Sequence, residues 1–167
     1  ARAEYKALDA IDEFLDLLDG APTVIVGNRA ALARIRAAVR RANMYTKSPV
    51  DGLVGPGGRP VVREMYGNIL LVDAGEKAGS ADPIIPIATR TVGSQTGVTG
   101  LTDLYAYRVG LDGFHAVATT TGRVVRTWLP DFTEAGAVKR GEVELGPVGV
   151  ALKATKAAAV FRNIKVR

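Results

Sequence analysis

The 167-residue chain contains no cysteine, a single histidine and few aromatic residues, which make up 6% of the sequence. Without cysteine the protein cannot form disulfide bonds, thiolate metal sites or a cysteine nucleophile. His115 stands alone, whereas histidine-based metal sites need two or more ligands at recognisable spacing. The chain also lacks a run of about 20 apolar residues, the length that a membrane-spanning helix requires. These absences favour a protein that neither binds a metal ion nor spans a membrane.

Motifs for catalysis or cofactor binding are equally scarce. The glycine-rich run at residues 55–58 has no Gly-Lys-Ser/Thr after it, and its proline removes a backbone donor that a phosphate cradle would use. Residues 110–113 (Gly-Leu-Asp-Gly) precede a predicted strand and not a helix, so they do not match a dinucleotide-binding fingerprint. No serine stands on a nucleophile elbow that could serve His115. We therefore expect no enzymatic activity, no catalytic residue, and no metal or other cofactor.

The chain does hold enough apolar material for a core, with 47% hydrophobic residues. A helix is predicted over residues 4–19, because apolar residues recur at helical spacing from Leu8 to Leu18 and Gly20 ends the pattern. The other face of this helix is acidic. Residues 1–20 hold six acidic and two basic side chains, although the whole chain has a net charge of +5. The charge is therefore unevenly spread, with an acidic leading segment on a basic body.

A second helix is predicted from residue 29 to about residue 42. It follows a short β-branched run at residues 23–26, which we interpret as a buried strand. Asn28 stands where a side chain is needed to cap the start of the helix. The helix buries aliphatic residues on one side, and its exposed side carries Arg29, Arg34, Arg36, Arg40 and Arg41.

The rest of the chain is predicted to consist of strands and loops. Surface loops are expected at residues 46–60 and 75–82, and strands at 60–66, 68–72, 124–129, 142–145, 148–153 and 157–166. Residues 104–109 and 114–119 are predicted to form a hairpin around the turn at residues 110–113. Helices early and strands late indicate an α+β fold, with a mixed or antiparallel sheet flanked by helices.

The two charged helix faces have more than one interpretation beside plain solvation. A regular helix spreads its carboxylates along a surface, which favours contact with the arginines of a neighbouring copy over acid–base chemistry or cation binding. The arginines could instead follow a phosphate backbone, but no aromatic side chain lies among them for base stacking. Exposed ion pairs contribute roughly 0–1 kcal/mol each, so only many together could hold subunits. The candidate subunit-contact residues are Asp9, Asp12, Glu13, Asp16, Arg29, Arg34, Arg36, Arg40 and Arg41.

Several stretches resemble the HK97-like major capsid proteins of tailed phages. Residues 8–20, with residues 22–29 and the arginine-rich helix after them, are similar to the end of the family's spine helix entering its axial domain. Residues 103–115 are similar to the family's hairpin, after which the chain returns to the peripheral domain. The stretches at 149–152 and 158–166 resemble the strand-rich C-terminus of such proteins.

The resemblance implies a truncated HK97-like capsid fold in three parts. Residues 1–20 would be the end of the spine helix, a peripheral-domain element. Residues 21–145 would form an axial-type α+β domain, and residues 146–167 would be C-terminal strands returning to a peripheral-type domain. Family members carry an N-terminal arm and an extended loop ahead of the spine helix, and we expect this chain to lack both.

The function implied by the resemblance is structural. The chain would self-associate into pentamers and hexamers of an icosahedral phage head, assembled in the host cytoplasm and retained in the virion. Its partners would be other copies of itself, with indirect contact to packaged DNA and no membrane or small-molecule partner. An encapsulin-like nanocompartment shell is the alternative, because encapsulins share this fold. A nucleic-acid-binding module that uses the basic face over residues 29–41 is a further alternative.

Overall fold

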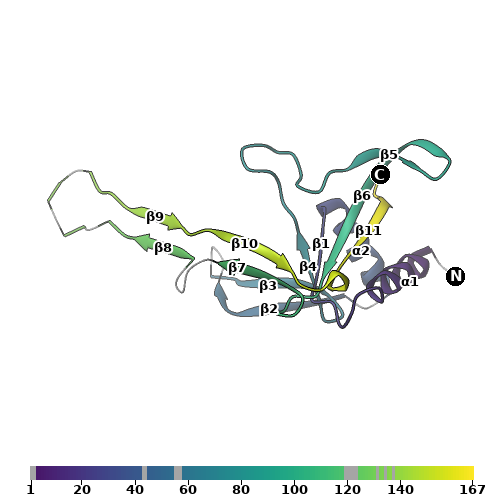
Figure 1. Ribbon diagram of the computed structural model, residues 1–167, viewed down its shortest axis with the longest axis horizontal. Helices are drawn as coiled ribbons and strands as arrows, with labels where there is room; N and C mark the ends of the chain where they lie inside the picture. The colour runs from purple at the N-terminus through teal and green to yellow at the C-terminus, as the bar shows by residue number, and fades with distance from the viewer. Residues whose placement is uncertain are drawn as a thin grey trace.

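The computed structural model describes residues 3–42, 45–54, 58–118, 124–130, 132–133, 135–136 and 138–167. In this part of the chain, two α-helices and a seven-stranded sheet form a body, from which a long two-stranded ribbon projects (Figure 1). None of the helices in these ranges is long and apolar enough to cross a membrane.

The body is built mainly from the first two thirds of the chain. It contains α1 (Ala3–Leu15), β1 (Val24–Gly27), α2 (Arg29–Arg41), β2 (Tyr45–Val54), β3 (Pro60–Tyr66), β4 (Ile69–Asp73), β5 (Ala88–Val92) and β6 (Gln95–Tyr107). The ribbon leaves along β7 (Phe114–Ala118) and β8 (Val125–Trp128) and returns along β9 (Glu142–Leu145) and β10 (Val148–Leu152). The chain then re-enters the body through the 3-10 helix η1 (Thr155–Ala157) and β11 (Ala158–Lys165).

The main sheet is mixed, which agrees with the predicted α+β fold with a mixed or antiparallel sheet. Its strand order is β11-β6-β1-β4-β3-β2, in which β1 and β4 run parallel and the other neighbours run antiparallel. β5 pairs with the first half of β6. It lies on the same edge of β6 as β1, because Leu101 pairs with Ala88 of β5 on one side and with Lys165 of β11 on the other. β6 is therefore the strand on which three others are assembled.

Both helices bury their apolar faces in one core with the sheet. The predicted cap of α2 is confirmed: the Asn28 Oδ1 atom accepts from the backbone N–H of Ala30 at 2.9 Å. The Asn28 amide also donates to the carbonyl of Ile85 at 2.8 Å, which satisfies this buried side chain. The core unites residues from α1, α2 and the central strands, among them Leu8, Ile11, Phe14, Leu32, Ile35, Val39, Ile25, Leu71 and Leu104.

Leu104 lies at the centre of this core and is 1% exposed. Gly27, its pairing partner on β1, has no space for a side chain, because a Cβ atom there would collide with the Leu104 side chain. The packing of the Leu104 side chain against the end of β1 thus depends on a glycine at this position, before α2 begins.

Three of the element predictions were wrong. The loop expected at residues 46–60 is largely strand β2, whose Pro49 is tolerated because β2 is the edge strand of the sheet. The helix expected to reach residue 19 ends at Leu15, and turns follow it. The hairpin expected around residues 110–113 does not form, because β6 pairs inside the main sheet whereas β7 pairs with β10.

The three-part division of the chain stays a prediction. α1 and β11 share the core of the main body, and the boundary expected after residue 145 falls between β9 and β10, on the returning side of the ribbon.

The substitution Leu104→Ala should destabilise the body more than any exposed change. It removes apolar contacts between both helices and the sheet and leaves a cavity, which costs about 2–5 kcal/mol of unfolding free energy. Urea denaturation followed by circular dichroism measures the loss, with Leu111→Ala as a matched control on an exposed turn. Equal stability of the two variants would contradict the central position of Leu104.

Candidate subunit-contact surfaces

The ribbon presents an apolar face that the described chain does not cover. Side chains alternate between the two faces of a strand pair, so residues two apart share a face. In the inner half of the ribbon, one face consists of Phe114, Ala116 and Ala118 with their partners Leu152, Val150 and Val148. All of these except Phe114 are exposed, and Val150 is 70% exposed.

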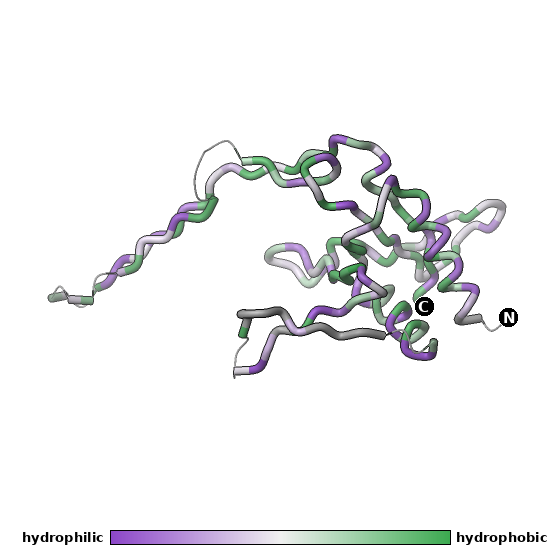
Figure 2. The backbone as a smooth tube through the Cα atoms, turned by 90° about the horizontal axis from the view of Figure 1, so that it is seen from below, coloured by the Kyte–Doolittle hydropathy of each residue, from purple (hydrophilic) through white to green (hydrophobic). Residues whose placement is uncertain are grey.

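The outer half of the ribbon repeats the pattern. Val125 pairs with Leu145, and Thr127 pairs with Val143, on one face. The opposite face carries an exposed ion pair, Arg126 to Glu144, at 3.9 Å. Hydrophobic residues therefore continue along the ribbon far from the body (Figure 2). A two-stranded ribbon is marginally stable at best in water, so this apolar face is expected to be covered by another protein surface.

The base of the ribbon is fixed by aromatic and ionic contacts. Phe114 stacks on Tyr107 with ring centroids 4.7 Å apart, and the Arg108 guanidinium donates to Asp112 at 2.7 Å. His115 lies in β7 opposite Ala151. No group of three or more histidine, cysteine or acidic side chains that could hold a metal was found in the described ranges.

The four acidic candidates all lie exposed on α1 or in the turn after it. Asp12 is also part of the fold, because its Oδ1 atom accepts from the Tyr66 hydroxyl at 2.7 Å. Burial raises the pKa of the Tyr66 hydroxyl above its ordinary value, and the hydrogen bond to Asp12 and the negative charges of Asp12 and Asp9 raise it further. Glu13 and Asp16 are exposed on the same short stretch as Asp9 and Asp12.

The five arginine candidates divide into two groups. Arg36 forms a half-buried ion pair with Glu64 of β3 at 3.0 Å, so it ties α2 to the sheet. Arg29, Arg34, Arg40 and Arg41 are exposed, and Arg34 donates to the carbonyl of Val166 at 3.1 Å. The structure therefore does not bring the five arginines together as one unbroken face.

Two basic residues near the last strand, Lys165 and Arg167, lie beside Arg34 and Arg41. The sequence analysis did not predict this grouping. Lys165 and Arg167 line an open hollow of about 530 Å³ with these two arginines, over a floor of Ala7, Ala38 and Ile164. The alternation of Lys165 and Arg167 was visible in the sequence. Their position beside α2 was not, because only the pairing of β11 with β6 places the chain end there.

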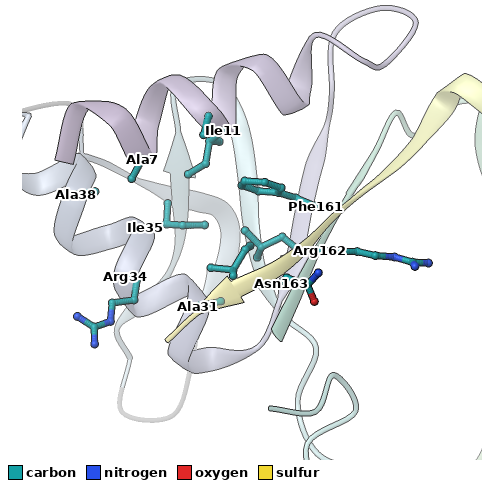
Figure 3. A pocket seen from close by; sticks show the side chains of 12 residues that line it. Ala7, Ile11, Ala31, Arg34, Ile35, Ala38, Phe161, Arg162 and Asn163 are labelled. Carbon is teal, nitrogen blue, oxygen red and sulfur yellow. The ribbon is translucent and has the colours of Figure 1, made fainter. Parts of the chain in front are cut away.

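The hollow continues into a deeper apolar pocket of about 230 Å³ between α1, α2 and β11. Its walls come from Ile11 of α1, Ile35 of α2, Leu104 of β6 and Phe161 of β11, with small alanines between them (Figure 3). The volume lies below the range of about 300–1,000 Å³ that is usual for small-molecule sites. Its size and lining are better suited to one apolar side chain.

A buried polar cluster lies on the other face of β6 and was also missed. The Asp103 carboxylate accepts from Arg90 at 2.6 Å and from the backbone N–H of Asn163 at 3.1 Å, where β11 is irregular and Asn163 has a φ of 61°. Burial by itself would raise the pKa of Asp103, but these two hydrogen bonds and the charges of Arg90 and Arg162 outweigh it and hold the pKa below its ordinary value. The cluster joins β5, β6 and β11 and has a structural role.

Comparison with solved structures gives a match over nearly the whole chain. The fold is similar to that of a chain in the cryo-EM structure of the holo-SrpI encapsulin complex from Synechococcus elongatus PCC 7942, with a TM-score of 0.56 and 18% sequence identity. The match covers 95% of this chain and 49% of the other, so this chain spans about half of that protein's length. No family model and no curated protein sequence matches. The chain therefore has the HK97-like α+β fold that the sequence resemblance predicted.

Tyr66→Phe tests the contact between the acidic helix and the sheet. Losing the hydrogen bond to Asp12 should cost about 0.5–1.5 kcal/mol at neutral pH. Folded Tyr66 holds its proton more tightly than the unfolded chain, so its contribution is complete below pH 10.0 and is lost as the pH rises through the folded pKa. Denaturation at increasing pH should thus show a weaker alkaline loss of stability in Tyr66→Phe than in the parent, whereas the exposed control Tyr5→Phe should match the parent.

Proposed function

We propose that this chain is a structural subunit of a closed protein shell, as a major capsid protein of the HK97-like tailed-phage type. The observation that carries the proposal is the uncovered apolar face of the ribbon, on a body whose fold is shared with a chain of an encapsulin complex. In this proposal the subunits associate around five-fold and quasi-six-fold axes, the shell is part of the virion, and no catalytic step takes place.

The ribbon supports the proposal because of its geometry. It projects from the body and exposes aliphatic side chains on the same face of paired strands. Burying apolar surface of this kind against a partner is favourable by roughly 25 cal/mol per Å². Copies of one chain in a lattice supply the area needed to cover such a surface repeatedly. The charged helix faces add contacts that set partner orientation more than strength.

An encapsulin-type compartment is the second candidate, and one observation favours it: a solved structure whose fold matches the chain is an encapsulin complex. The two candidates differ in what the shell encloses. Nuclease treatment of purified particles distinguishes them, since protected DNA inside the shell supports the phage head and enclosed protein without DNA supports the compartment.

Electron microscopy of the protein expressed from its natural reading frame tests shell formation. The parent should form rings or closed particles. Val150→Asp places a charge on the exposed apolar face of the ribbon and should abolish particles without altering the circular dichroism of the subunit. Val117→Asp is the matched control, because Val117 lies on the opposite face of the same strand pair and should be tolerated.

Two results would argue against the proposal. One is a parent protein that stays monomeric at high concentration. The other is particle formation by Val150→Asp at the level of the parent, which would mean that the apolar face of the ribbon plays no part in assembly.

A further inference from the structure

The pocket between α1, α2 and β11 has a chemistry that defines its occupant. Its interior is apolar, and its mouth is basic, with Arg34, Arg41, Lys165 and Arg167 around the adjoining hollow. Among the lining residues that the structure describes, none is acidic. The complementary partner is therefore one exposed apolar side chain with carboxylates on both sides of it.

The chain itself carries such a segment. Leu17 is 67% exposed in the turn that follows α1, whereas the neighbouring Leu18 is buried in the core. Asp16 and Asp19, both exposed, stand on either side of this pair. The backbone there is fixed by hydrogen bonds from Leu18 N–H to the Leu15 carbonyl and from Asp19 N–H to the Lys156 carbonyl, so Leu17 is held outward and does not belong to the core of the described residues.

The Leu17 side chain does not enter the pocket of its own chain, because it is 67% exposed. Ile11 is the last residue of α1 that lines the pocket, and a helix rises about 1.5 Å per residue, so Leu15 at the end of α1 already lies about 6 Å further along. Leu17 with Asp16 and Asp19, here called the plug, lies at and beyond this end of the helix, and the buried side chain of Leu18 anchors the turn in the core. A contact between plug and pocket therefore joins two copies.

From this arrangement we infer that Leu17 of one copy enters the pocket of a second copy, with Asp16 and Asp19 meeting the basic residues at its mouth. The inference rests on the proposed shell function and names the surface through which neighbouring subunits meet. The contact is head-to-tail, since it uses different surfaces on the two copies. Contacts of this kind generate rings when their rotation closes, which is the geometry that a shell built from five-fold and six-fold units needs.

Crosslinking between two single-cysteine chains tests the contact directly, because the parent has no cysteine and gives no background. One chain carries Ala21→Cys, beside the plug, and the other carries Ala7→Cys, at the pocket mouth. A flexible bismaleimide should join them into a covalent dimer on a denaturing gel. Leu111→Cys, at a 79% exposed position in the turn at residues 110–113, replaces Ala21→Cys as the control and should give little dimer.

Adding Leu17→Asp to the Ala21→Cys chain should lower the dimer yield at least about tenfold. Burial of the leucine side chain supplies the affinity of the contact, and a tenfold loss of affinity corresponds to about 1.4 kcal/mol. Leu111→Asp, a matched change at an exposed leucine, should leave the yield unchanged. The Ala21→Cys and Ala7→Cys pair without further changes should also crosslink less in about 1 M salt, where the screening length falls to roughly 3 Å.

Charge reversal makes the test specific. Asp16→Lys with Asp19→Lys on the plug chain should remove the dimer, and so should Lys165→Glu with Arg167→Glu on the pocket chain. Mixing the two reversed chains should restore the dimer, because each reversed surface then meets its opposite.

Failure of this inference is distinguishable from failure of the shell proposal. Particles in the microscope without a dimer between the plug and pocket chains would overturn the head-to-tail contact and leave the shell proposal standing. A dimer that forms without particles would support the head-to-tail contact and count against the shell proposal, since crosslinking captures a weak pair that need not close into a shell. Equal dimer yield from Leu111→Cys and Ala21→Cys would overturn the contact. A mixture of the two charge-reversed chains that forms no dimer would also overturn it.

Discussion

Strand β6 is the element on which the rest of the structure depends. Its second half is buried on both faces, with Leu104 and Ala106 packed against the two helices and Asp103 bonded to Arg90 on the other side. The same strand pairs with β1, β5 and β11. Apolar burial keeps β6 inside the sheet, so the chain leaves the sheet at the end of β6 and returns as β11, the edge strand beside it. The ribbon is the segment of chain between β6 and β11.

This arrangement leaves two kinds of incomplete surface. The ribbon carries aliphatic residues that are exposed in the described part of the chain, and the pocket between α1, α2 and β11 opens into a basic hollow. Isolated charge pairs at either place would contribute little, since exposed ion pairs are worth roughly 0–1 kcal/mol. In the proposed shell, apolar contact supplies the affinity and the charges select which surfaces meet. This combination suits a subunit that, as proposed, first binds weakly and then settles into a lattice.

Local signals in the sequence were enough for much of the body. The helical spacing of apolar residues predicted both helices, Asn28 predicted the start of α2, and the strands predicted at residues 60–66 and 68–72 correspond to β3 and β4. These features depend on neighbours a few residues away. The failures came where distant partners decide, as in β2, which exists because β3 pairs with it although it contains Pro49. The turn at residues 110–113 has hairpin chemistry, but the competing partners of β6 and β7 prevented a hairpin.

The sequence by itself determined the composition of the surfaces: an acidic first helix, a basic second helix, no cysteine, and alternating aliphatic residues in the later strands. Only the tertiary structure decided which of these side chains pair within the fold and which lie together on one surface. It paired Arg36 with Glu64 inside the fold, and it placed Lys165 and Arg167 beside Arg34 at the mouth of a pocket. The physical reason is that composition and periodicity are local properties of the chain. Which side chains share a surface is set by strand pairing between residues far apart in sequence, and no local pattern encodes that.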